Sequence, residues 1–146
     1  MATHRIMRYI NRTFRVGKLY RNARLSEIGL EGSDQPFLLA LCREPGITQD
    51  RLAKEIYIDK SVVARKLANL EKNGYVRRES DPDDKRVLRV YPTEKTLSLQ
   101  PAIRVTLDDW NELIARGFSE EEKATLEALL IRIMENAMAW ADGENK

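Results

Sequence analysis

The sequence is poor in the residues from which many active sites are built. It holds one cysteine, Cys42, and one histidine, His4, among 146 residues. A disulfide needs two cysteines and a structural zinc needs four nitrogen or sulfur ligands, so we expect no internal disulfide, metal or other cofactor. A lone cysteine is typical of proteins in a reducing cytoplasm, where we expect this protein to reside.

Two further absences narrow the function. No apolar run approaches the roughly 20 residues that a membrane-spanning helix needs, and residues 1–25 lack the apolar core of a signal peptide. There is no glycine-rich phosphate loop, and the single histidine offers no general base beside a nucleophile. We therefore expect a protein that is not an enzyme and does not enter a membrane.

What the sequence has instead is an uneven distribution of charge. Residues 1–95 carry 20 basic and 13 acidic side chains, whereas residues 96–146 carry five basic and ten acidic ones. A basic body with an acidic extension is the pattern expected of a protein that binds a polyanion with one part and not with the other.

Hydrophobic periodicity and capping residues predict a mostly helical chain. We expect helices over 4–28, from a cap at Ser33 or Asp34 to Pro45, over 49–55, over 60–73, from Thr93 onward with a kink or division near Pro101, and from Ser119 to about Asp142. Ser119 to Glu122 has the spacing of a capping box.

The two short helices over 49–55 and 60–73 resemble a helix-turn-helix. Thr48 and Asp59 are suitable N-cap residues, and Gly74 stands where a helix commonly ends in a left-handed residue. The spacing of Val63, Leu67 and Leu70 predicts a buried stripe on the second helix.

A small hairpin is expected next. Residues 75–80 and 86–91 alternate between apolar and polar side chains, and Asp81-Pro82-Asp83-Asp84 between them is typical of a turn. The fold class is therefore mainly α with a small β-hairpin wing (α+β), as in a winged helix-turn-helix.

This arrangement places candidate DNA contacts on three elements. The exposed face of the second short helix offers basic, hydroxyl and small apolar side chains, and the start of the first short helix offers free N–H groups that favour a phosphate. We expect DNA contacts from Thr48, Gln49, Lys60, Ser61, Val62, Arg65 and Lys66.

The turn of the hairpin supplies the remaining candidates: Asp84, Lys85 and Arg86. Three aspartates in four residues would repel DNA, unless an aspartate such as Asp84 orients an arginine. An arginine fixed on a narrow tip can enter a minor groove. The alternative is a solvated acidic turn without function, and the residues alone leave both interpretations open.

The stretch from Gly46 to Lys95 resembles the MarR family of regulators. The resemblance rests on Leu52-Ala53, on the run from Leu70 to Arg78, on the Asp-x-Arg wing motif at Asp84-Lys85-Arg86, and on Thr93-Glu94-Lys95. The chain departs from the common family pattern at several positions: Val62, Ala64, Asn69, Pro92 and Thr96. The departures at Val62, Ala64 and Asn69 lie on the second short helix, the recognition helix, and put in question which bases this helix reads.

The resemblance implies the organisation and the activity. Residues 1–146 would form one MarR-like domain, with a DNA-binding lobe at 33–93 and helical dimerisation regions at 1–30 and 94–142. The protein would be a sequence-specific regulator of transcription, a repressor, that binds a pseudo-palindromic site on double-stranded DNA as a homodimer. It would be released by a small aromatic or phenolic acid.

Other interpretations stay open at this stage. Cys42 could sense oxidants, although a buried structural thiol is commoner. Trp110 and Trp140 could line a ligand pocket or pack in the core or a dimer interface. A winged-helix module that binds protein instead of DNA is the alternative function, and the basic residues of the helix and the wing disfavour it.

Overall fold

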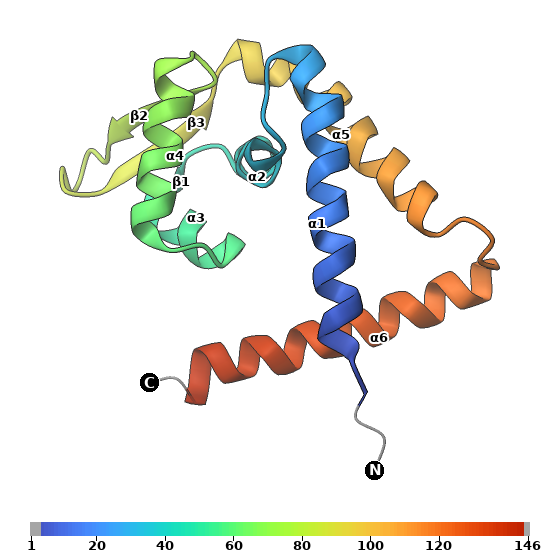
Figure 1. Cartoon of the computed structure of the whole chain (residues 1–146). Helices are drawn as coiled ribbons and strands as arrows, with labels where there is room; N and C mark the ends of the chain where they lie inside the picture. The colour runs from blue at the N-terminus through green and yellow to red at the C-terminus, as the bar shows by residue number, and fades with distance from the viewer. Residues whose placement is uncertain (1–3, 145–146) are drawn as a thin grey trace. The chain divides into compact units, whose positions relative to one another are not determined.

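The computed structural model describes residues 4–144 (Figure 1). The chain divides into two compact units, of which the first ends at Trp110 and the second begins at Asn111. Helix α5 runs through this boundary.

The elements follow the order expected of a winged helix-turn-helix. The helices are α1 (Ile6–Leu25), α2 (Gln35–Arg43), α3 (Gln49–Ile56), α4 (Lys60–Lys72), α5 (Glu94–Ile114) and α6 (Glu120–Ala139). The strands are β1 (Ile47–Thr48), β2 (Val76–Ser80) and β3 (Leu88–Pro92), and short 3₁₀ turns occupy Ser26–Ile28 (η1) and Gly32–Asp34 (η2). The expected mainly helical fold with a β wing is confirmed.

Local chemistry explains where the short helices begin and end. The Thr48 side chain accepts a hydrogen bond from Arg51 N at the start of α3, and Asp59 accepts one from Ser61 N at the start of α4. Gly74 follows α4 with φ of 80°, a left-handed conformation that glycine adopts without a steric penalty. The capping box of Ser119 and Glu122 at α6 is likewise present.

Three expectations need correction. The first helix ends at Leu25 instead of Ile28, because Ser26 to Ile28 tighten into a 3₁₀ turn that closes on Gly29. Of the kink or division expected near Pro101, the division is absent, because helix α5 continues through this residue. The cost of the proline is one helical hydrogen bond, which the rest of this long helix tolerates.

The third correction concerns the wing. The sheet has three strands in the order β1-β3-β2, all antiparallel, and not the two of a simple hairpin. Strand β1 pairs Ile47 with Val90 and Thr48 with Arg89. The wing is thereby joined directly to the residue that caps α3.

The core of the first unit is formed by the apolar faces of its helices, which pack together with apolar residues of the sheet. The largest fully buried side chains include Leu25, Leu38, Leu41, Leu52, Val63, Leu67, Leu70, Val90 and Ile103. Burial of each large aliphatic side chain contributes about 2 kcal/mol to the free energy of folding. The stripe predicted on α4 is thus confirmed as the side that faces the core.

Helix α1 packs on the part of α5 that belongs to the first unit. A Cβ atom at Gly17 would lie 3.1 Å from the Trp110 ring. The rings of Tyr20 and Trp110 lie 5.1 Å apart, and Arg24 Nη2 forms an ion pair with Asp109 Oδ2 at 2.9 Å. Gly17 therefore allows α1 to approach α5 closely at this point.

Helix α6 lies in the second unit and buries none of its residues. Its exposed apolar side chains include Leu126, Leu129, Leu130, Ile131, Ile133 and Met134. Over residues 4–144, no helix is long and apolar enough to cross a membrane.

Candidate nucleic-acid interface

The exposed face of α4 is short of free hydrogen-bond donors. Ser61 donates its hydroxyl proton to Asp59 Oδ1 at 2.6 Å, and Lys60 Nζ lies 3.7 Å from Asp50 Oδ2. Val62 is 41% exposed. Arg65 is exposed and forms no ion pair within residues 4–144. Arg65 therefore carries the largest free donor set on this face.

Asp59 is held as a carboxylate at the start of α4. Hydrogen bonds from Ser61, through its side chain first and its backbone second, lower the pKa of Asp59. An anion at a helix N-terminus is favourable, because it faces the positive end of the helix dipole.

The start of α3 presents Thr48 and Gln49. Arg78 Nη1 donates to Gln49 Oε1 at 3.2 Å, and the same guanidinium is fixed by Glu71 Oε1, 3.2 Å from Arg78 Nη2. A side-chain amide needs its oxygen and its nitrogen together to read adenine. With the oxygen engaged by Arg78, Gln49 offers its NH₂ group alone, which suits a phosphate.

At the wing tip the structure brings Asp84 and Arg86 together. Arg86 Nε and Nη2 donate to the two carboxylate oxygens of Asp84 at 3.1 and 3.2 Å, and Arg86 N donates to Oδ1 as well. These bonds lower the pKa of Asp84. The Arg86 side chain nevertheless remains 90% exposed. The ion pair expected from the sequence is therefore present, and it leaves Arg86 facing outward.

Asp81 was missed by the sequence analysis as an organiser of the wing. Its Oδ1 accepts hydrogen bonds from Asp83 N at 2.8 Å and Asp84 N at 3.2 Å, and its Oδ2 accepts one from Arg89 Nε at 2.6 Å. The backbone N–H of Asp83 first and Arg89 second lower the pKa of Asp81. Arg89 Nη1 also donates to Gly46 O at 2.8 Å, so it joins the wing to the loop before α3.

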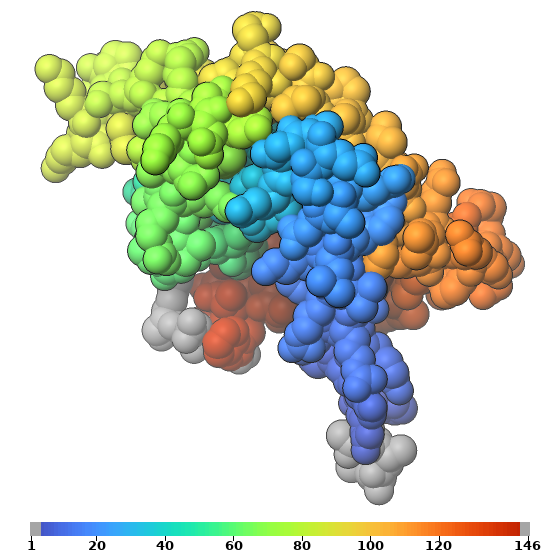
Figure 2. All heavy atoms as spheres, turned by 45° about the horizontal axis from the view of Figure 1, so that its top comes forward, coloured from blue at the N-terminus to red at the C-terminus, as the bar shows by residue number. Residues whose placement is uncertain are grey.

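The wing and α3 together form a pocket of about 230 Å³, lined by Thr48, Gln49, Asp50, Arg86, Val87 and Leu88. Three of the expected DNA contacts, Thr48, Gln49 and Arg86, thus share one hollow. The wing, yellow-green in the space-filling view, projects from the surface of its unit (Figure 2). Lys85 on its tip is exposed.

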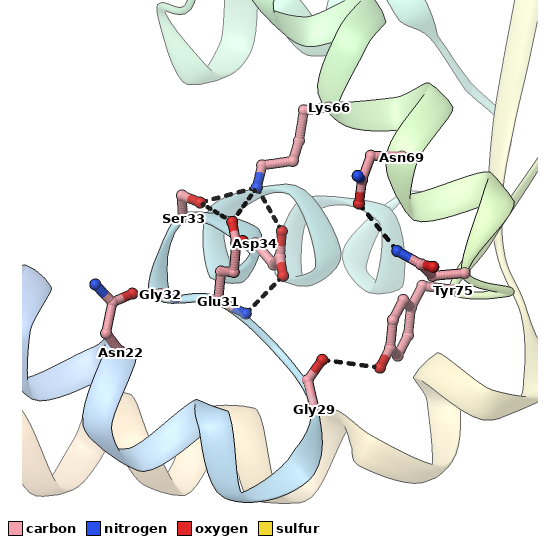
Figure 3. Close-up of polar contacts among 10 residues, drawn as sticks. Asn22, Gly29, Glu31, Gly32, Ser33, Asp34, Lys66, Asn69 and Tyr75 are labelled. Atoms are coloured by element: carbon pink, nitrogen blue, oxygen red, sulfur yellow. Dashed lines mark hydrogen bonds and ion pairs between the residues drawn. The ribbon is translucent and has the colours of Figure 1, made fainter.

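Lys66 departs from the expected arrangement. Its side chain is only 17% exposed, and Nζ lies 2.7 Å from Asp34 Oδ1 and 2.8 Å from Ser33 Oγ (Figure 3). The expectation that its ammonium faces outward with the rest of the set is wrong. The physical reason is that the buried carboxylate of Asp34 attracts it more strongly than solvent does.

Comparison with known proteins decides the family. A model of the MarR family matches residues 28–87. The chain is also 30% identical over 131 residues to the uncharacterized HTH-type transcriptional regulator YybA of Bacillus subtilis (strain 168), which covers 90% of this chain and 87% of that relative.

The chain belongs to the MarR family.

Solved structures of MarR-family proteins superpose on nearly the whole of this chain. A MarR transcriptional regulator from Methanosarcina mazei Go1 superposes with a TM-score of 0.87 and 32% identity, covering 91% of this chain and 96% of the other. A MarR family regulator from Listeria monocytogenes, solved in complex with a 26mer DNA, gives a TM-score of 0.88 and 28% identity, with 97% of each chain covered. This protein is therefore a winged helix-turn-helix transcriptional regulator of the MarR family and not an enzyme.

Two observations on this MarR-family chain bear on redox sensing and on metal binding. Burial raises the pKa of the Cys42 thiol, and the nearby Arg104 opposes this shift without overcoming it. A thiol with a raised pKa forms little of the reactive thiolate at neutral pH. This favours a packing role for Cys42 over redox sensing. Among residues 4–144, no group of three or more His, Cys, Asp or Glu side chains is placed to hold a metal ion.

Proposed function

We propose that this MarR-family regulator binds a pseudo-palindromic operator on double-stranded DNA as a homodimer. In this assignment α4 enters the major groove with Arg65 and Val62 toward the bases, while Lys60 and the start of α3 contact phosphates. The wing places Arg86 in the adjacent minor groove, with Lys85 beside it. Asp84 orients Arg86.

The exposed Asp84–Arg86 pair is the observation that carries this proposal. A guanidinium has five N–H donors, and Asp84 occupies two of them. The remaining donors point to solvent from a narrow projecting tip, which is the shape and charge that fit a narrow minor groove. The similar Listeria monocytogenes regulator, solved with a 26mer DNA, supports the assignment.

The homodimer is supported by large apolar side chains that are exposed on each of the two units. Helix α6 has no buried residue, and α1 exposes Ile6, Met7, Tyr9, Phe14, Val16 and Leu19. Large apolar side chains exposed in this number are typical of a protein–protein interface. A second copy of the chain is the partner that a pseudo-palindromic site requires, because its two half-sites need two equivalent lobes about one helical turn apart.

The experiment that tests the proposal compares Arg86→Ala with the wild type. We expect the affinity for the operator, first identified by selection from random-sequence duplexes, to fall about tenfold or more, as for loss of a charge-assisted contact. Sedimentation equilibrium should show the same oligomeric state for both proteins. Unchanged operator affinity would contradict the wing assignment.

A salt series separates DNA binding from the alternative of a protein-binding module. DNA affinity should fall steeply with rising salt, because bound phosphates release counterions. A wild-type protein that enriches no sequence and binds duplexes without this dependence would refute the proposed function.

The finer regulatory role is also proposed here. The resemblance to MarR regulators supports a repressor that a small aromatic or phenolic acid releases from DNA, through a change in the separation of the two lobes. A panel of aromatic carboxylates titrated into the operator complex tests this role. A compound of this class should weaken operator binding without dissociating the dimer, and a panel without effect would contradict it.

A further inference from the structure

A partly buried ion cluster joins the recognition helix to the connection between α1 and α2. Lys66 Nζ, from the middle of α4, donates to Asp34 Oδ1 at 2.7 Å, to Ser33 Oγ at 2.8 Å and to Glu31 Oε2 at 3.3 Å (Figure 3). The side chain of Asp34 is 8% exposed and that of Lys66 is 17% exposed. The strongest pair in the cluster is therefore withdrawn from solvent.

All three N–H donors of Lys66 are used within this cluster. An ammonium group has three N–H donors and no acceptor, and Lys66 has three acceptors around it. Asp34 Oδ1 binds Lys66, and Asp34 Oδ2 accepts a hydrogen bond from Glu31 N at 2.8 Å. Lys66 could thus reach a phosphate only by leaving the buried carboxylate of Asp34 without its counter-charge.

The balance of forces keeps the ammonium charged in this place. Burial acts to lower the pKa of Lys66, but hydrogen bonds and charge from Asp34 and then Glu31 outweigh it, so the pKa lies above the ordinary lysine value.

The turn that holds Lys66 is itself fixed to α1. Asn22 Oδ1, on α1, accepts a hydrogen bond from Gly32 N at 2.7 Å. A Cβ atom at Gly32 would lie 2.6 Å from that oxygen and 3.1 Å from the backbone Asn22 N, so a larger residue would push the turn away from α1. The chain of contacts therefore runs from α1 through Gly32 and Asp34 to the middle of α4.

A second contact holds the segment just past the end of α4 to the same connection. The Tyr75 hydroxyl donates to Gly29 O at 3.2 Å (Figure 3). Two anchors, at Lys66 and Tyr75, fix the inclination of a helix better than one, because a single point leaves the helix free to pivot.

We propose that Lys66 is a positioning residue, which sets the inclination of the recognition helix against α1 through its buried pair with Asp34 and does not itself contact DNA. This inference rests on the proposed function, since it assumes that α4 reads DNA. Base contacts demand placement within about 0.5 Å, whereas phosphate contacts tolerate more. Lys66 therefore contributes to discrimination between sequences through its neighbour Arg65.

The test uses the full-length protein, the selected operator duplex and a scrambled duplex of equal length and composition. Lys66→Met removes the ammonium and keeps most of the side-chain volume. We expect operator affinity to fall about tenfold, the size of losing one base contact. Affinity for the scrambled duplex, and the slope of log affinity against log salt, should stay unchanged.

Asp34→Asn provides the decisive second variant, because Asp34 lies at the buried end of the pair. It should show the same loss of discrimination, and combining it with Lys66→Met should add little to either single change. Lys60→Met is the matched control on the same helix. Lys60 is exposed and proposed to bind a phosphate, so its variant should weaken both duplexes and reduce the salt slope by about 0.9.

Several outcomes would overturn the inference. A reduced salt slope for Lys66→Met, without an effect of Asp34→Asn, would make Lys66 a phosphate contact. An equal loss of affinity for both duplexes, at an unchanged salt slope, would mean that the substitution affects only folding. An unchanged operator affinity would mean that Lys66 does not position the helix. If Lys66→Met does not fold, the double variant Lys66→Met with Asp34→Leu, which leaves no unpaired buried charge, gives the same readout.

Failure of the proposed function would look different. It would appear in the wild-type protein, as an absence of any sequence preference, before a variant is measured.

Discussion

The wing tip and the recognition helix each pair a basic side chain with an aspartate, with opposite results. On the wing, Asp84 holds Arg86, whose side chain remains 90% exposed. On α4, Lys66 is bound by Asp34 and is only 17% exposed. Asp84 engages two of the five donors of a guanidinium, whereas the cluster at Asp34 engages all three donors of an ammonium.

The difference teaches that an ion pair near DNA has two distinct uses. In an exposed pair, the unbonded donors of the cation stay available to a ligand. In a buried pair, all donors of the cation are engaged, and the pair fixes the position of a helix. Exposed ion pairs contribute little to folding, and breaking a buried one is costly. Variants of the two sites should therefore separate stability from binding.

The largest expected effect is on stability at the buried pair. Lys66→Ala leaves the carboxylate of Asp34 without its ammonium, and should lower the free energy of unfolding by about 3 kcal/mol, at the low end for breaking a buried ion pair. Urea denaturation followed by circular dichroism measures this change. Lys60→Ala is the exposed control, with an expected loss of about 0.5 kcal/mol or less. Equal losses for the two variants would remove the contrast between buried and exposed pairs.

A smaller effect is expected at Arg89, which links the wing to the loop before α3. Arg89→Ala removes the bonds to Asp81 and Gly46 while Arg86 stays in place. We expect operator affinity to fall about fivefold, less than for loss of a base contact, because the tip loses its fixed direction and keeps its charge. Amide hydrogen exchange of the wing should accelerate while that of α4 does not. Uniform acceleration throughout the protein would point instead to a role of Arg89 in global stability.

The smallest effect concerns pH. The pKa values of Asp81 and Asp84 are lowered in the folded protein, so their contribution to wing order is present above the ordinary aspartate value and is lost as the pH falls below about 3.9. The raised pKa of Lys66 gives the converse, with its contribution lost only as the pH rises beyond about 10.4. These groups predict constant amide protection of the wing and of α4 from pH 5 to 9, about one unit inside those values. A transition in amide exchange of the wing within that range would contradict the assignment.

The sequence predicted well what neighbouring residues decide. Thr48, Asp59 and Ser119 act as N-caps because the partner of each is a backbone N–H within three residues. The pair of Asp84 and Arg86 is two residues apart and was also expected. Such contacts are visible in a sequence because local geometry nearly fixes them.

Contacts between distant residues could not be predicted in this way. Lys66 is next to the buried stripe of α4, at a boundary where a long side chain can turn either way, and its partner Asp34 is 32 residues distant. Strand β1 has two residues, too few to show an alternating pattern. Arg89 meets Asp81 only because antiparallel pairing brings β2 and β3 together. In each case tertiary packing supplies what the local pattern lacks.

The contact of Gly17 with Trp110 gives the protein an optical reporter of helix packing. The Trp110 ring packs against Tyr20 of α1 at a tilt of 34°, whereas Trp140 is 54% exposed. With Trp140 replaced by phenylalanine, a single indole remains, and it is packed between α1 and α5. Its emission would then follow the separation of these two helices in solution, without an attached dye.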